Sequence, residues 1–272
     1  MNQTVAQSAP VNYTGSRSSI ITNMKKHFAI IACFLAAALT FNASAGERGF
    51  KKIFNGRNLD GWRGNPELWS VEDDAITGTT TAENKIKHNT FLVWDAGKLK
   101  NFELRLQYKI GKVGNSGIQY RAAELSQGDF GPIVGGYQAD FEAGKKYSGI
   151  LYEERGRGIL ALRGEKVVIK GVKEVEIKRK GKTIKRKQPD KEVTGSVGKS
   201  EDIQAKIKAE DWNDYRIVAK GNHLQHFING VKTVEVTDND EANAAKQGIL
   251  AFQIHVGPPM KVQFRNVRVK NL

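Results

Sequence analysis

Hydrophobic and polar residues alternate along much of this chain, most regularly between positions 102 and 110. Five apolar residues there (Phe, Leu, Leu, Tyr and Ile) are separated by Glu, Arg, Gln and Lys. A period of two over such a stretch predicts a β-strand with one buried and one solvated face. Shorter stretches of the same kind predict strands at 116–121, 137–141, 215–220, 223–228, 231–236, 248–255 and 262–269.

Turn signals separate these predicted strands. Gly-Asn at 221–222 and Asn-Gly at 229–230 each join two short strands, which indicates a β-meander. In the last predicted strand the alternation changes phase, which predicts a β-bulge near 265–266. A short helix is expected only at 240–246. Many short strands with almost no helix predict an all-β fold, an antiparallel β-sandwich or jelly roll formed by one domain over 46–272.

The first part of the chain follows a different pattern. Residues 1–23 are polar and show no periodicity, whereas Met24 opens a short basic stretch that is followed by an apolar run at 28–39. The apolar run is too short to span a membrane, and small residues precede a cleavage point after Ala45. We therefore expect residues 1–45 to be a leader and signal peptide with Met24 as the true start. The mature protein would be periplasmic or secreted.

Composition narrows the chemistry. The only cysteine, Cys33, lies in the predicted signal peptide, so the mature chain would have no thiol, disulfide or cysteine metal ligand. The formal net charge is +14, and much of it comes from a basic insertion at about 164–200. Clustered cations can track phosphate, but this segment lacks interleaved aromatics and the protein is expected to be exported, which disfavours a nucleic-acid partner. An exposed hairpin or loop is expected, with possible contact to an anionic glycan or membrane surface.

Hydrogen-bonding side chains concentrate between Gly114 and Arg157, on segments that are expected to be strands and are rich in glycine. Such a face can bind a hydroxyl-rich ligand such as a sugar, or it can be an ordinary solvated sheet face. No Gly-x-Ser-x-Gly elbow, zinc helix of the HExxH type or phosphate-binding loop is present. The histidines are scattered, and His255, at the end of an apolar strand, is either functional or structural.

Carboxylates in the same region offer further chemistry. Asp140, Glu142, Glu153 and Glu154 could supply an acid and a base, or could hold a divalent cation. They could equally be ion-pair partners of neighbouring arginines. No cofactor is certain from the sequence, and a divalent cation is the one candidate.

Several motifs together carry a resemblance to a known family. They include IFNGRNLDGW at 53–62, GNSGIQYR at 114–121, GYQAD at 136–140, FING at 227–230 and QIH at 253–255. On these motifs the mature chain resembles the 3-keto-disaccharide hydrolase family, which has a concanavalin A-like lectin/glucanase fold. Many family members have Tyr-Glu-x-Gln where this chain has Tyr-Gln-Ala-Asp, which changes the charge of a candidate catalytic or ligand-binding group.

The resemblance implies a hydrolase acting on 3-keto-glycosides. A ketone at C3 acidifies the proton on C2, so a base can remove that proton while the anomeric group leaves, and water then adds. Asp140 would be the base or a cation ligand, and Arg121 and His255 would stabilise the enolate or donate a proton. The alternatives are a non-catalytic carbohydrate-binding module and a surface-interaction protein that uses the basic segment. The candidate sugar-binding residues are Asn115, Gln119, Tyr137, Gln138, Glu153, Arg155 and Gln253.

Overall fold

The computed structural model describes residues 47–179 and 181–272, and one compact unit runs from Gly49 to Leu272. The predicted leader and signal peptide lie outside the described residues. Within the described part of the chain, no helix combines the length and apolar character needed to cross a bilayer.

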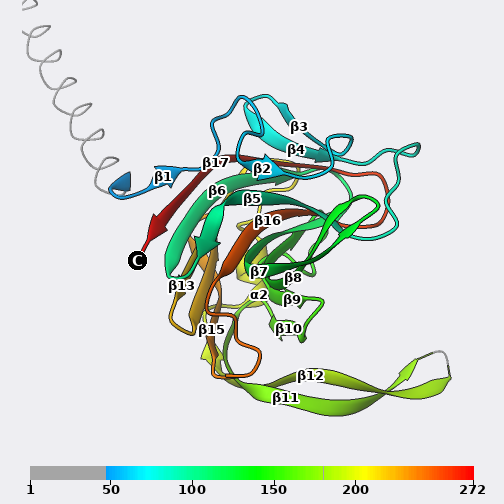
Figure 1. Ribbon diagram of the computed structural model, residues 1–272. Coiled ribbons are helices and arrows are strands. Elements are labelled where there is room, and N and C mark those ends of the chain that lie inside the picture. Colours follow the sequence, from blue (N-terminus) through cyan, green and yellow to red (C-terminus); the bar gives the residue numbers. More distant parts are fainter. Residues whose placement is uncertain (1–46, 180) are drawn as a thin grey trace, which may run out of the picture. The chain divides into compact units, whose positions relative to one another are not determined.

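Two β-sheets make up this unit (Figure 1). The larger sheet runs β12-β11-β15-β14-β13-β6-β17-β4-β3 among the described residues, with β1 paired to β17. Neighbouring strands are antiparallel, except that β11 pairs in parallel with β15. The strands of the larger sheet are β1 (Lys51–Lys52), β3 (Trp69–Glu72), β4 (Ala75–Thr79), β6 (Phe102–Ile110), β11 (Glu165–Arg179), β12 (Lys182–Ser196), β13 (Asn213–Lys220), β14 (His223–Ile228), β15 (Val231–Asp238) and β17 (Lys261–Asn271).

The smaller sheet runs β10-β9-β8-β7-β16-β5-β2 and pairs its strands antiparallel throughout. Its central hairpin, β7 and β8, carries most of the polar residues singled out in the sequence. The strands of the smaller sheet are β2 (Trp62–Arg63), β5 (Thr90–Leu99), β7 (Asn115–Gly128), β8 (Gly131–Glu142), β9 (Leu151–Glu154), β10 (Gly158–Ala161) and β16 (Gly248–Ile254).

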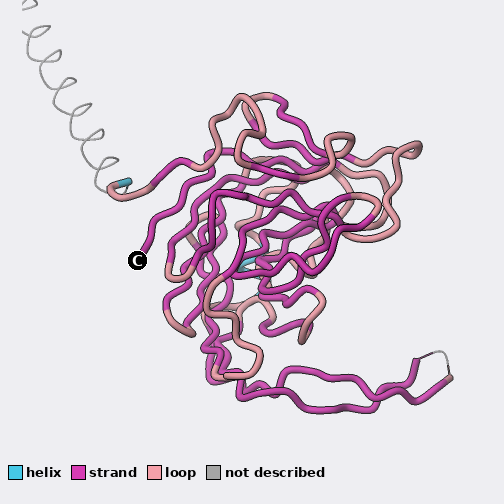
Figure 2. The backbone as a smooth tube through the Cα atoms, in the orientation of Figure 1, coloured by secondary structure: helices cyan, strands magenta, loops and turns pink. Residues whose placement is uncertain are grey.

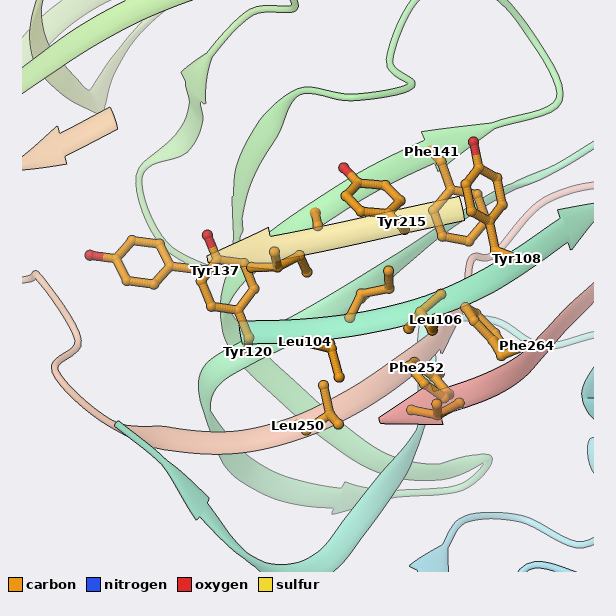
Figure 3. Close-up of a cluster of buried hydrophobic side chains, with 14 of the residues drawn as sticks. Leu104, Leu106, Tyr108, Tyr120, Tyr137, Phe141, Tyr215, Leu250, Phe252 and Phe264 are labelled. Atoms are coloured by element: carbon orange, nitrogen blue, oxygen red, sulfur yellow. The ribbon is translucent and has the colours of Figure 1, made fainter. Parts of the chain in front are cut away.

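Aromatic and aliphatic side chains from both sheets fill the space between them (Figure 3). Phe252 of the smaller sheet stacks on Phe264 of the larger one with ring centroids 4.0 Å apart. Tyr108 and Phe141 meet across the same interface at 4.0 Å. On β6 the buried and partly exposed positions alternate as the sequence predicted. Interdigitating inner faces of two sheets define a β-sandwich, which confirms the predicted all-β fold.

Local turn chemistry explains several connections. Asn229 and Gly230 both have positive φ, 49° and 81°, as a two-residue type I′ hairpin turn requires. The predicted bulge is confirmed, because the pairing of β17 shifts between Arg265 and Arg268 and Asn266 has a φ of 55°.

The helix predicted at 240–246 is wrong. The structure has only a turn there, because the Asp240 carboxylate accepts hydrogen bonds from Arg157 and Asn243 and the chain then leaves directly for β16. A five-residue helix, α2 (Ser200–Gln204), lies elsewhere, directly after the basic segment.

The basic segment forms a long β-hairpin of β11 and β12 (Figure 2). Only residues 166–169 of β11 join the larger sheet, by pairing with β15. Beyond that point the two strands pair with each other alone and extend away from the sandwich. Of the two alternatives left open by the sequence, a hairpin and a loop, the structure has the hairpin.

Candidate functional site

The β7–β8 hairpin bends back over the outer face of the smaller sheet. In sheet order β5 and β8 are separated by β7 and β16, yet Thr90 at the start of β5 donates a hydrogen bond to the Phe130 carbonyl at the hairpin tip (2.5 Å). Two register shifts, between Tyr120 and Ala123 and between Glu124 and Ser126, allow the bend. A small apolar cluster lies on this outer face, separate from the intersheet core, and consists of Phe91, Val93, Ala122, Val134 and Ala251.

Next to this apolar cluster, the outer face carries a group of amides around one carboxylate. Asn115 donates a hydrogen bond from Nδ2 to Asp140 Oδ1 over 2.7 Å. Gln138 also hydrogen-bonds to Asp140 and accepts in turn from Gln119. These side chains share a face because Gln119 pairs with Gln138 and Gly117 pairs with Asp140 in the ladder, while Ile118, Tyr120 and Phe141 point into the core.

Asp140 is the chemically distinctive member of this group. Its side chain is buried, and burial raises the pKa of the carboxyl to about 8, against the lowering effect of the hydrogen bonds from Asn115 and Gln138. Nearby Glu142 and Glu154 add a smaller upward contribution to the same pKa. A carboxyl that titrates near neutral pH can exchange protons in either direction, which is the property required of a general acid or base.

Gly117 makes room for this arrangement. A Cβ at Gly117 would lie 2.4 Å from the Gln138 side chain, closer than any real contact. A larger residue would therefore push Gln138 away from Asp140. Gly117, one of the glycines of this segment, thus allows the close approach of the Gln138 side chain, not the close approach of a backbone.

A second set of polar groups continues the same face. The Glu154 carboxylate accepts from Asn89 Nδ2 (3.2 Å) and from Gln253 Nε2 (3.3 Å). Among the described residues, Gln119 Oε1 and Gln253 Oε1 have no hydrogen-bond partner although both are buried. Buried acceptors of this kind are normally satisfied by water or by a ligand hydroxyl.

His255 lies directly after β16, at the border of this face. Gln253 pairs with Phe91 in the β16–β5 ladder. Continued three residues beyond Phe252, the β16–β7 register sets His255 opposite Asn115. Its Nδ1 is 2.6 Å from the Val256 carbonyl, so Nδ1 carries the proton and Nε2 is left as the acceptor in the neutral ring. Alternation continued past the end of β16 sets His255 on the same face as Gln253 and Asp140.

Arg121 is not brought to Asp140. It has a φ of 46° at the β7 register shift, and its guanidinium donates to the carbonyls of Lys100 and Gly221, each at 2.7 Å. Further bonds reach Ala245 and Asn101. Arg121 therefore ties three chain connections together, and burial among neutral carbonyls lowers the pKa of its guanidinium.

Tyr137 and Glu153 also face away from the amide cluster. Glu153 Oε2 accepts from Arg157 over 2.7 Å, and Arg157 continues to Asp238 and Asp240. The Tyr137 hydroxyl donates to Asp238 over 2.5 Å. This buried ionic network joins the β9–β10 turn to the end of β15.

Arg155 lies in the exposed β9–β10 turn with a φ of 54°, apart from the buried network and from Asp140. Of the predicted site residues, the structure gathers Asn115, Gln119, Gln138, Asp140, Gln253 and His255 on one face.

Two contributors were missed in the sequence. Asn89 precedes an apolar strand and carries no recognisable signal. Tyr152 pairs with Gln138 across the β8–β9 ladder, and burial raises the pKa of its hydroxyl, with Glu154 adding to the increase. For a metal ion, the described residues offer no group of three or more His, Cys, Asp or Glu side chains.

The two packed sheets and the polar outer face define a β-sandwich with a candidate ligand-binding surface. The chain belongs to the family described as the 3-keto-alpha-glucoside-1,2-lyase-like domain, which matches residues 49–270. The resemblance found in the sequence is thereby confirmed. A curated relative, the 3-keto-disaccharide hydrolase of Bacteroides thetaiotaomicron, is 39% identical over 88 residues. That stretch spans 30% of this chain and 30% of the relative.

Two solved structures, from Parabacteroides distasonis and Bacillus subtilis, are similar in fold. A glycosyl hydrolase candidate from Parabacteroides distasonis is 19% identical, with a TM-score of 0.48 over 84% of this chain and 95% of that one. The carbohydrate binding module CBM66 from Bacillus subtilis is 12% identical, with a TM-score of 0.47 over 78% and 96% of the two chains. Neither likeness assigns a function.

Proposed function

We propose that this protein is an exported enzyme that cleaves 3-keto-glycosides at the outer face of the smaller sheet, with Asp140 as its acid–base group. The observation that carries the proposal is the buried Asp140 carboxyl, which has a pKa raised to about 8 and lies among amide side chains. Family membership supplies the substrate class, a glycoside with a ketone at C3.

The proton-removal step of the proposed reaction has a matching group on this face, the Asp140 carboxylate. Ionised Asp140 removes the proton from C2, which the C3 ketone acidifies, and the electron pair moves onto the ketone oxygen as an enolate. The enolate then expels the anomeric oxygen, which takes up a proton, leaving a C1–C2 double bond; water adds across it to complete hydrolysis. A base of pKa near 8 is stronger than an ordinary carboxylate and suits removal of a proton from carbon.

The neighbouring side chains hold the reacting groups. Asn115 and Gln138 orient the carboxylate of Asp140 through their hydrogen bonds. The unpartnered Gln119 and Gln253 oxygens are acceptors for sugar hydroxyls. His255 takes the role that the sequence analysis assigned to Arg121, which is bound to backbone carbonyls elsewhere. To protonate the leaving oxygen, His255 would need a proton on Nε2 in addition to the one that Nδ1 donates to Val256.

A second candidate is a carbohydrate-binding module without catalysis. The observation that favours it is that Asp140 has only amide hydrogen-bond partners in the described chain, with no second titratable group bonded to it. Amides grouped around one carboxylate are sufficient to bind hydroxyls without reacting with them.

One experiment separates the two candidates. Product release from a 3-keto-glucoside and from its unoxidised parent would be followed for the wild type and for Asp140→Asn, with sugar binding measured by calorimetry. Turnover of the keto form alone, lost in the variant while binding persists, supports the enzyme. Saturable binding without turnover in the wild type supports the binding module and removes the catalytic role of Asp140.

The pH profile gives an independent check. If ionised Asp140 is the base, kcat/KM should rise with pH and reach half its maximum near the pKa of about 8. A profile that falls through this range would instead make protonated Asp140 the required form.

A further inference from the structure

A groove of about 420 Å³ lies at the edge of the smaller sheet, where the basic hairpin passes the β9–β10 turn. Its wall includes Glu154 and Arg155 from that turn region, and Val172 and Lys187 from the hairpin. Strand β10 contacts both β11 and β12. Glu154 also accepts a hydrogen bond from Gln253 of the polar face around Asp140, so the groove and the candidate site share this residue.

Arg186 reaches the same border from the hairpin. Its Nη2 lies 3.6 Å from the position that a Cβ would take at Gly158, the first residue of β10. The positive charge of Arg186 also acts on the hydroxyl of Tyr152, whose pKa responds to Asp140 as well. Tyr152 Cε2 lies 3.9 Å from the same Cβ position at Gly158, and Tyr152 pairs with Gln138 in the ladder, so Tyr152 connects the hairpin border with the amides around Asp140.

The cations at this border differ from those at the hairpin base in having no carboxylate partners. Lys170 pairs with Glu192 at 2.6 Å and Lys191 pairs with Glu165 at 3.0 Å, which neutralises the base of the hairpin. The side chains of Arg155, Arg186 and Lys187 form no hydrogen bond or ion pair with another described residue, and all three are exposed.

We propose that Arg155, Arg186 and Lys187 form a subsite for an anionic group on the glycan, a sugar carboxylate or sulfate next to the sugar that binds at Asp140. This inference rests on the proposed function and names its substrate class as acidic glycosides. Guanidinium groups suit the planar carboxylate and the sulfate oxygens, and a nearby lysine adds a point charge. The hairpin is then a specificity element of the site.

Calorimetry with two matched oligosaccharides tests the subsite. One ligand is neutral and the other carries a uronic acid, with a sulfated version as a third arm. For Arg186→Ala/Lys187→Ala we expect roughly tenfold weaker binding of the anionic ligands and unchanged binding of the neutral one. Raising the salt concentration should reduce the preference of the wild type for anionic over neutral ligands, because the screening length of charge–charge interactions shortens to a few ångströms near 1 M.

The control compares Lys187→Ala with Lys178→Ala, which removes one exposed charge nearer the tip of the same hairpin. Lys185 is kept because it pairs with Glu174 at 3.9 Å. Equal weakening in Lys178→Ala would mean a diffuse attraction by the hairpin and would overturn the subsite, as would a wild type without preference for acidic ligands. Loss with only the uronate or only the sulfate identifies the anion.

Turnover of a neutral 3-keto-glucoside is measured in parallel. If it persists without any anionic preference, the subsite fails while the proposed function stands. If no keto-glycoside is turned over, the calorimetry still tests the subsite, now as part of a binding module.

Discussion

Asp140 should make the stability of the protein fall as the solution becomes alkaline. Burial holds the pKa of its carboxyl at about 8 in the folded protein, whereas an aspartate in an unfolded chain titrates near ~3.9. Because the folded pKa is the higher one, the folded state binds the extra proton. Its stabilising contribution is complete below the unfolded pKa and disappears as the pH rises through 8.

The magnitude follows from proton linkage. Between pH 6.5 and 9 the unfolded aspartate is already ionised, so only the folded group titrates, and RT ln(1 + 10^(pKa − pH)) decreases by about 2 kcal/mol. His226 opposes this fall slightly: burial lowers its folded pKa to about 3, so only the unfolded chain loses its proton above pH 6.5, and this raises stability by about 0.4 kcal/mol across the window. Burial raises the pKa of Tyr108 to a value above the window.

Urea unfolding at a series of pH values measures the effect. We expect the free energy of unfolding of the wild type to fall by about 1.5 kcal/mol from pH 6.5 to pH 9, and that of Asp140→Asn to rise by about 0.5 kcal/mol or less. Asp214→Asn, an exposed aspartate on β13, is the matched control and should follow the wild type. An equal decline in Asp140→Asn would refute the argument that the buried carboxyl carries the proton.

Three further predictions follow from the same contacts. In an Asp140→Asn background, the free energy of unfolding should drop by about 1.5 kcal/mol from pH 6.5 to 5, because the pKa of buried His226 is lowered to about 3 and only the unfolded chain takes up the proton. Adding His226→Gln should abolish this drop, as measured by urea unfolding. Arg157→Met should cost about 3–5 kcal/mol in thermal or urea unfolding, since it leaves Glu153 and Asp238 buried without their cation, and a cost below 1 kcal/mol would contradict the buried network. Gly117→Ala should displace Gln138, and its main effect should be a lower kcat, with a smaller effect on the free energy of unfolding. An unchanged kcat would show that the Gln138–Asp140 hydrogen bond is dispensable.

The sequence was sufficient for the fold because period-two alternation and turn residues act locally. Strand β6 and the bulge at Asn266 could be read directly from neighbouring residues. The face of each polar side chain could be predicted only where the ladder stays regular, as it does for Asn115 and Asp140.

Arg121 shows where this reasoning fails. A single residue of positive φ at a register shift changes the direction of its side chain, and its hydrogen-bond partners lie at distant turns. Nothing local in the sequence marks Arg157 as the partner of Asp238, 81 positions further along the chain, because long-range ion networks depend on how separate strands meet. Sequence alone therefore identified the polar residues without assigning each to its face.

The attachment of the basic hairpin affects whether two copies of the protein can associate through their sheet edges. Without β11, the larger sheet would end on β15, and an unpaired strand edge is a template on which a second chain can add. The four-residue parallel joint covers that edge and moves the free edge out to β12, which carries Lys185, Arg186, Lys187 and Pro189. Like charges repel an approaching copy, and proline removes one donor from the ladder. The hairpin thus protects the sandwich against edge-to-edge aggregation.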